Sequence, residues 1–264
     1  MRRFNSQYQL FLMLILGGLI AACSSKKEEP ASSAMTEKAG LQYQFAYEFY
    51  QRGDLVRALG ASLEAKAESP KNIEIMNLLG LIYFRQGEFE KALAEFTEAT
   101  TISPKAADVL NNMGTLYYQQ RKYDLALETF DRALQNPLYL YPERIYNNIG
   151  LVYAAQGNIE MSRGSYEKAI SLRPDYYLPY QNLAKLLISQ NQLKRAKSLL
   201  LEAVNLCKGC SEPNYHLAST YLKEDKKERA SEFYKKAYDV DPKGYYGMLA
   251  KKSLIDLGKM KDDE

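Results

Sequence analysis

IEIMNLLGLIYFRQGEFEKALAEFTEATTISPKA, residues 73–106, is the stretch of sequence that decides the fold. Each half places apolar residues at the i, i+3, i+4 and i+7 spacing of one helix face. Gly87 separates the halves, where a left-handed residue can end a helix. Pro104 follows the second half, and proline cannot continue a helix interior. The stretch therefore predicts two antiparallel helices joined by a tight turn.

Small residues mark where these two helices approach each other. Gly80 and Ala92 are expected to bring the helices close, while Tyr83 and Phe96 fill the space beside them. The first of these small positions recurs along the chain with a spacing of 34 residues, apart from one step of 36: it is Ala46, Gly80, Gly114, Gly150, Ala184 and Ala218. A period in this range predicts a solenoid whose units are stable only when stacked.

The template fits six times, over 39–72, 73–106, 107–140, 143–176, 177–210 and 211–244. Its positions resemble the tetratricopeptide repeat, with Ser62 replacing an aromatic residue and Ser162 replacing an alanine. The resemblance implies an all-α, right-handed superhelical solenoid, a surface for protein partners more than a pocket for chemistry. Residues 245–264 are expected to supply a capping helix, over 245–258, and a charged tail, since the last apolar face needs cover.

The N-terminus reads as a targeting segment. Arg2 and Arg3 precede an apolar run, residues 10–20, that is short for a membrane span. The run ends in Ala21-Ala22-Cys23, which resembles a bacterial lipobox and implies cleavage after residue 22 and acylation of Cys23. The alternative is an ordinary signal peptide with an incidental cysteine. Residues 24–38 are expected to form a flexible tether. Ser24 after the cysteine favours sorting to the outer membrane.

Composition excludes several classes of function. Removing residues 1–22 lowers the formal net charge from +3 to +1, which argues against a nucleic-acid partner. No phosphate loop, metal-ligand motif or nucleophile elbow appears, so we expect no enzyme, cofactor, metal or small-molecule substrate. The single histidine, His216, is interpreted as a groove or packing residue.

Two cysteines replace the usual proline turn after the fifth repeat. In a periplasmic chain, Cys207 and Cys210 predict a local disulfide. Its ring is short, so the stabilisation is expected to be about 1–2 kcal/mol. A redox-active pair is the alternative, although the flanks are helical and lack a strand. Haem attachment is disfavoured because Ser211, not histidine, follows the pair.

Asparagines recur just before the apolar-small pair of three repeats. Asn112, Asn148 and Asn182 would form a column on the concave face of a tetratricopeptide superhelix, resembling the asparagine ladder of some peptide-binding relatives. Each amide offers a donor and an acceptor for an extended peptide backbone. The alternative is that these amides bridge adjacent helices and bind nothing. Four tyrosines are expected to edge the same face: Tyr43, Tyr47, Tyr118 and Tyr215.

The surplus of two residues between the third and fourth repeats should bend the superhelix or display a loop. It includes Tyr141-Pro142-Glu143-Arg144. Together with Val109-Leu110-Asn111-Asn112 and the segment 118–123, it resembles the PilF/PilW/Tgl pilotin family of type IV pilus biogenesis. The resemblance implies a lipoprotein on the periplasmic face of the outer membrane that assists assembly of the secretin, its partner. Two alternatives are a general tetratricopeptide scaffold of the envelope, serving cell-wall enzymes or outer-membrane protein assembly, and a redox or chaperone module using the cysteine pair.

Overall fold

The computed structural model describes residues 35–261, whose regular structure consists of thirteen helices. None of these helices is both long and apolar enough to cross a membrane. The predicted signal peptide, Cys23 and the tether up to residue 34 lie outside the described residues, as do residues 262–264.

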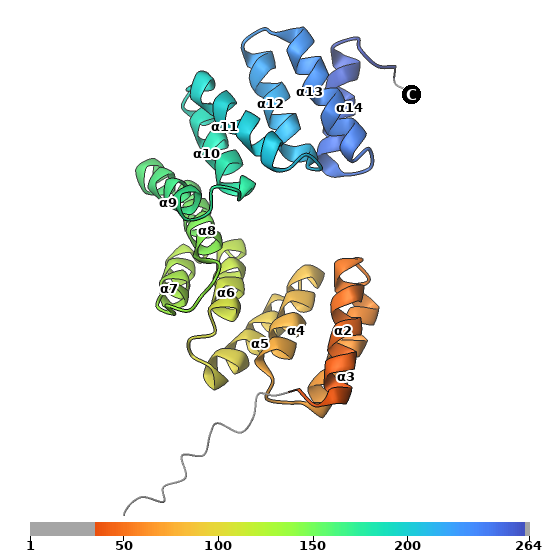
Figure 1. The fold of residues 1–264 in the computed structure, drawn as a ribbon, viewed down its shortest axis with the longest axis vertical. Coiled ribbons are helices and arrows are strands. Elements are labelled where there is room, and N and C mark those ends of the chain that lie inside the picture. Colours follow the sequence, from red (N-terminus) through yellow and green to blue (C-terminus); the bar gives the residue numbers. More distant parts are fainter. Residues whose placement is uncertain (1–34, 262–264) are drawn as a thin grey trace, which may run out of the picture.

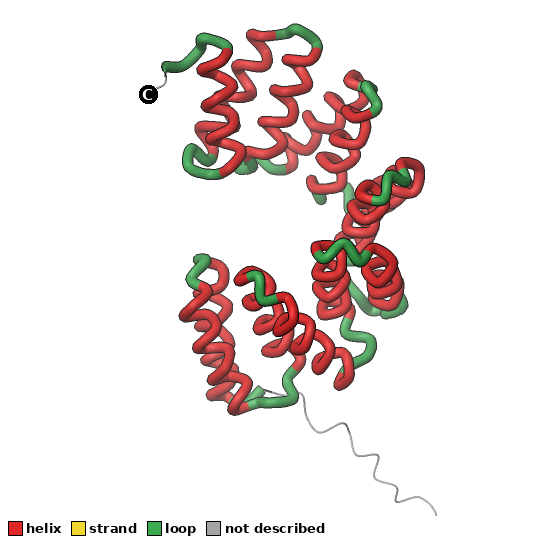
Figure 2. The backbone as a smooth tube through the Cα atoms, turned by 180° about the vertical axis from the view of Figure 1, so that it is seen from behind, coloured by secondary structure: helices red, strands yellow, loops and turns green. Residues whose placement is uncertain are grey.

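The helices form six consecutive antiparallel hairpins and one final helix. Their bounds are α2 Glu37–Gln51 with α3 Leu55–Glu68, α4 Ile73–Gln86 with α5 Phe89–Ile102, α6 Ala107–Gln119 with α7 Tyr123–Leu134, α8 Pro142–Ala155 with α9 Ile159–Leu172, α10 Tyr177–Ser189 with α11 Leu193–Leu206, α12 Ser211–Lys223 with α13 Lys227–Val240, and α14 Tyr245–Asp256. The hairpins follow an open curve with α2 and α14 at its two ends (Figures 1 and 2).

One boundary differs from the sequence prediction. The first helix begins at Glu37, inside the segment 24–38 that was assigned to the flexible tether. The reason is a helix cap, because the hydroxyl of Thr36 accepts a hydrogen bond from the Ala39 amide at 3.1 Å. The first repeat therefore starts two residues earlier than its apolar pattern indicates.

The predicted close approach of small and aromatic residues holds the hairpins together. A Cβ atom added at Gly114 would lie 2.6 Å from the Phe130 ring, and one added at Gly150 would lie 2.5 Å from the Tyr166 ring. Phe130 and Tyr166 are almost fully buried. Because glycine has no side chain, the first helix thus leaves room for the aromatic ring of the second helix.

The turn between the two helices of each hairpin contains one residue in the left-handed region. Three of these six residues are glycines with φ of 76–80°, and the others have φ of 56–59°. They occupy the same place in each repeat: Gly53, Gly87, Arg121, Gly157, Asn191 and Asp225. The prediction that Gly87 ends its helix in this conformation is confirmed, with φ of 80°.

The two ends of the solenoid differ in how their apolar faces are covered. At the C-terminal end, α14 buries Ala250 and Leu254, as a capping helix should. At the N-terminal end, Leu41 and Phe45 of α2 remain 52% and 44% exposed. The residues at the place of Phe45 in the next five repeats are at most 8% exposed, namely Leu79, Met113, Ile149, Leu183 and Leu217.

Candidate functional site

A hollow of about 660 Å³ lies where the first helices of the early repeats meet the insertion after α7. Its lining comes from four regions of sequence: Tyr43 of α2, then Glu74, Asn77 and Leu81 of α4, then Asp108, Asn111 and Asn112 of α6, and Leu138 to Tyr141 with Arg144. The hollow thereby joins two features that the sequence indicated separately, the asparagine column and the loop that breaks the period.

The insertion is an ordered loop that is tied back to the preceding repeat. The Asn136 amide donates to the Lys105 carbonyl at 3.0 Å, and its side-chain oxygen accepts from the Leu138 amide at 3.0 Å. The Tyr139 hydroxyl donates to Asp108 Oδ1 at 3.3 Å. Burial and the neighbouring Asp108 carboxylate raise the Tyr139 pKa, so the phenol stays protonated and continues to donate. The surplus residues thus display a loop, one of the two predicted outcomes.

Charged and aromatic groups fix the end of this loop where it enters α8. Two guanidinium groups contact the Tyr141 ring, with Arg144 at 4.5 Å and Arg173 at 5.1 Å from its centroid. Arg173 also pairs with the buried carboxylate of Glu143, at 3.0 Å. Pro142 is the first residue of α8, where proline suits a helix start. Tyr141, Pro142 and Glu143, three of the four residues proposed to be specific to the family, therefore anchor the loop. The fourth, Arg144, is exposed and lines the hollow.

Two leucines of the loop face solvent. Leu138 is 84% exposed and Leu140 is 74% exposed, although both belong to a loop that is held by hydrogen bonds. Large apolar side chains in contact with water at the rim of a hollow are typical of a protein-binding surface. Sequence reasoning did not select them as site residues, but a signal existed: apolar residues alternate with tyrosine where a polar turn is usual.

The asparagine column bridges neighbouring repeats. Asn112 donates to Asn77 Oδ1 at 2.8 Å, Asn148 donates to Asn111 Oδ1 at 2.9 Å, and Asn182 donates to Asn147 Oδ1 at 2.9 Å. These bonds match the bridging interpretation, because one donor of each amide is committed to the preceding repeat. Asn77 was not singled out from the sequence, although it lies 34 residues before Asn111.

The column nevertheless reaches the hollow at one end. Asn77, Asn111 and Asn112 line it, whereas Asn148 and Asn182 do not. The first bridge therefore presents amide groups to the hollow while it fixes the spacing of α4 and α6. Hydrogen bonds to a partner backbone remain possible there because each amide carries two N–H groups and an oxygen with two lone pairs.

The four predicted tyrosines do not form one surface. Tyr43 lines the hollow, and its ring stacks on that of Tyr47, 6.5 Å away between centroids. Tyr118 is half-buried against Tyr123. Tyr215 is half-buried in the last repeat, where its ring contacts Tyr234 and Tyr246 at 5.5 Å. Only Tyr43 and Tyr47 are thus near the hollow, and the other two serve packing.

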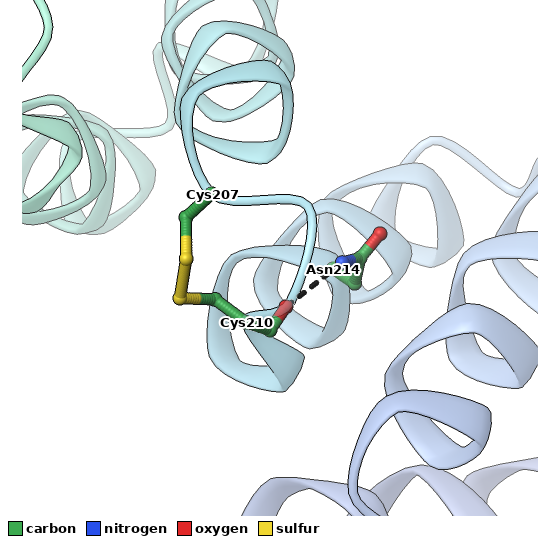
Figure 3. Close-up of a disulfide and its surroundings, with 3 residues drawn as sticks. All are labelled: Cys207, Cys210 and Asn214. Carbon is green, nitrogen blue, oxygen red and sulfur yellow. Dashed lines mark hydrogen bonds between the residues drawn. A yellow bond between two sulfur atoms is a disulfide. The ribbon is translucent and has the colours of Figure 1, made fainter.

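Cys207 and Cys210 form a disulfide in the turn between α11 and α12 (Figure 3). Cys207 follows the last residue of α11, and Cys210 precedes the first residue of α12. The Cys210 carbonyl accepts a hydrogen bond from the Asn214 amide at 2.9 Å (Figure 3). The crosslink therefore takes the place of the proline turn found after other repeats.

The groups that line the hollow are suited to binding. The hollow combines amide groups, an apolar rim and charges of both signs from Glu74, Asp108 and Arg144. Among residues 35–261, no group of three histidine, cysteine or acidic side chains is placed to hold a metal ion. Exposed apolar side chains beside polar groups are typical of protein-binding surfaces.

Models of one repeat family match most of the described chain. A model described as TPR repeat matches residues 80–121, and one described as tetratricopeptide repeat matches 107–136. A second tetratricopeptide-repeat model matches 143–176, 179–210 and 211–243.

Curated relatives match over short segments. The uncharacterised protein ycf37 of Pyropia yezoensis is 32% identical over 62 residues, which is 24% of this chain and 35% of that protein. The human protein O-mannosyl-transferase TMTC3 is 28% identical over 101 residues, 38% of this chain and 11% of that protein. The matches thus span about a third and about a tenth of these relatives.

Solved structures match over most of the chain. PilF of Pseudomonas aeruginosa aligns with a TM-score of 0.65 and 19% identity, over 82% of this chain and 98% of PilF. PilW, described as a widely conserved type IV pilus biogenesis factor, aligns with a TM-score of 0.69 and 20% identity, over 81% of this chain and 98% of PilW. A thermophilic tetratricopeptide protein of Thermus thermophilus aligns with a TM-score of 0.63 and 20% identity, over 70% of this chain and 99% of that protein. The repeat matches and the six stacked hairpins together identify this chain as a tetratricopeptide-repeat protein.

Proposed function

We propose that this protein is an outer-membrane lipoprotein that binds the secretin of a type IV pilus and promotes its assembly. The observation that carries the proposal is the hollow where the asparagine column meets the loop 135–141, with Leu138 and Leu140 exposed at its rim. The sequence resemblance to the pilotin family supports it. So does the likeness in fold to PilF and PilW, which extends over almost the whole of both proteins.

The proposed mechanism is binding and positioning. Acyl chains on Cys23 hold the solenoid at the periplasmic face of the outer membrane, and more than one chain gives a stable anchor. A secretin segment lies in the hollow, with its apolar side chains against Leu138 and Leu140 and its backbone at the amides of α4 and α6. Tethering raises the concentration of secretin subunits at the bilayer and thereby favours multimers.

A pair of matched double variants tests the role of the hollow. Leu138→Ser with Leu140→Ser removes the apolar rim. Leu125→Ser with Leu172→Ser removes two leucines of similar chemistry, 44% and 41% exposed, which do not line the hollow. The rim variant should lose secretin from detergent-solubilised envelopes and lower the fraction of secretin recovered as multimers. The control variant should retain both.

Deletion of the gene tests the function itself. We expect loss of secretin multimers and of surface pili, with normal cell shape. Normal secretin multimers in the deletion strain would refute the proposal. If the deletion strain loses secretin multimers but the rim variant supports their assembly, the function stands and the binding site is elsewhere on the solenoid.

A general scaffold of the cell envelope is the second candidate. The matches to tetratricopeptide-repeat models support it, because they identify a protein-binding solenoid without naming its partner. This function predicts a cell-wall or outer-membrane protein defect in the deletion strain, with secretin multimers intact. The redox alternative predicts that Cys207→Ser with Cys210→Ser abolishes function while the chain still folds.

A further inference from the structure

The first helix carries a short stripe of residues whose spacing is the same in both directions. Its members follow one another at intervals of three, four and three residues along one side of α2: Lys38, Leu41, Phe45 and Glu48. Two apolar side chains form its centre, and opposite charges form its ends. Reversing the direction of the helix therefore exchanges the two apolar residues with each other and the lysine with the glutamate.

This stripe is open to solvent although the same side of every later first helix is covered. Leu41 and Phe45 are about half exposed, and Lys38 and Glu48 are exposed. The residues at the place of Glu48 in the later repeats are buried and uncharged, namely Ile82, Leu116, Val152, Leu186 and Thr220. The stripe thus lies where a preceding repeat would pack, and it carries a charge where the later repeats have none.

A shallow hollow of about 570 Å³ lies beside the N-terminal half of the stripe. The described residues that line it all belong to α2: Glu37, Lys38, Gly40, Leu41 and Gln44. A Cβ atom added at Gly40 would meet no neighbouring side chain within 4 Å. The C-terminal half of the stripe carries the exposed ring of Phe45 instead. One half therefore offers space, and the other half offers a bulky apolar group.

We propose that this stripe binds the same stripe of a second copy of the chain, with the two α2 helices antiparallel about a two-fold axis. This arrangement places Phe45 of each copy against Leu41 of the other copy, beside the hollow at Gly40. It also places Lys38 of each copy opposite Glu48 of the other. A parallel arrangement would instead bring like charges together, which is unfavourable.

The two charged residues are available for this contact because their ion pairs within the chain are exposed. Lys38 pairs with Glu68 at 2.6 Å, and Glu48 pairs with Arg52 at 3.4 Å. The side chains of Lys38 and Glu48 are nevertheless 70% and 60% exposed. Exposed ion pairs contribute little to stability, so exchanging them for a pair with the second copy costs little.

Dimerisation through the stripe leaves the larger hollow, beside loop 135–141, open. Tyr43 is the residue of α2 that lines that hollow. It follows Leu41 by two residues, which places it about 200° further around the helix. Contact with a second copy on one side of α2 therefore does not cover the other side. The dimer presents two copies of the larger hollow, each beside its own loop.

Sedimentation equilibrium of the full chain in density-matched detergent tests this proposal. The apolar centre consists of two side chains from each copy, fewer than a stable interface contains, so we expect a reversible dimer with a dissociation constant of about 100 μM. Phe45→Lys should raise this constant by more than about tenfold, because a two-fold interface contains the residue twice. Val56→Lys is the matched control, since Val56 is 80% exposed on α3, outside the stripe, and it should leave the constant unchanged.

Reversal of the charges identifies the orientation of the second copy. Lys38→Glu alone and Glu48→Lys alone should each raise the dissociation constant by about threefold to tenfold, because each places like charges opposite one another. The double variant restores opposite charges and should return the constant to within about twofold of the wild type. Circular dichroism of every variant should show the helix content of the wild type.

Three results would overturn the proposal. The first is the mass of one chain at every concentration up to about 1 mM. If Phe45→Lys then also lowers binding to phosphatidylglycerol vesicles, the stripe contacts a lipid surface instead of a second copy. The second is an equal effect of Phe45→Lys and Val56→Lys. The third is a double charge variant that dimerises no better than Lys38→Glu, which would exclude the antiparallel contact.

Discussion

The two ends of the solenoid differ in whether their terminal apolar faces are covered. At the C-terminal end, α14 packs on the last hairpin and buries Leu254. At the N-terminal end, Leu41 and Phe45 occupy places that are buried in all later repeats, yet about half of each side chain is exposed. The difference shows that a residue in a repeat array is buried only where a neighbouring repeat or helix packs against it. Its position within the repeat alone does not ensure burial.

The largest contrast is expected between equivalent residues of the first two repeats. Leu79→Ala should lower the free energy of unfolding by about 2–5 kcal/mol, because its side chain is fully buried and the substitution leaves a cavity. Phe45→Ala, at the same place in the first repeat, should cost less than about 1 kcal/mol. Urea denaturation of both variants provides the measurement. Equal losses would show that another part of the chain covers α2.

The second-largest loss of stability is expected at the C-terminal end, which α14 covers. Leu254→Ala removes a side chain that is 3% exposed in α14. We expect a loss of about 2 kcal/mol, at the lower end of the range for buried leucines, because a terminal helix can detach locally. Hydrogen exchange should quicken in α12 to α14 and stay unchanged in α2 to α5. Uniform quickening along the whole chain would contradict this local response.

Electrostatics should give the smallest contrast between the ends. Burial alone would raise the Glu212 pKa, but hydrogen bonds from His216 and Tyr246 and the charge of Lys185 outweigh burial and lower the pKa to about 2. The resulting stability is complete above the ordinary pKa of 4.5 and is lost as pH falls towards 2. Glu212→Gln should remove roughly 1 kcal/mol of this acid sensitivity, after allowance for solvent screening.

The control for this prediction is an ion pair at the other end. Lys38 and Glu68 form an ion pair in which the lysine side chain is 70% exposed. Lys38→Ala should therefore leave unfolding unchanged at every pH. A pH-dependent loss in this variant, measured by the same denaturation series, would mean that α2 is more covered than the described residues indicate.

Sequence reasoning was strongest for features that repeat. The 34-residue spacing predicted the six hairpins because a small residue of each first helix lets the second helix of the same repeat come close, as Gly80, Gly114 and Gly150 do against an aromatic ring. The capping helix was predicted because the last apolar face needs cover. The same logic located the turn at Gly87. The same reasoning did not identify the equivalent turn residues Arg121, Asn191 and Asp225. These adopt the left-handed conformation although they are not glycines.

The candidate site was predictable only in part. Asn112 was predicted from the sequence as a residue of the column, and its amide bridges to Asn77. An amide serves a bridge or a peptide equally well, so the sequence left both roles open. The loop posed a different difficulty. Its surplus residues were counted from the sequence, whereas the hydrogen bond from Tyr139 to Asp108 joins residues 31 apart and required the coordinates.

The insertion has a further consequence for how such arrays change length. Asn148 reaches Asn111 over 37 residues with the same 2.9 Å geometry that Asn182 achieves over 35. The extra residues therefore leave this bridge between neighbouring first helices intact. At this junction the chain can therefore be longer without loss of the hydrogen bond that joins the repeats on either side.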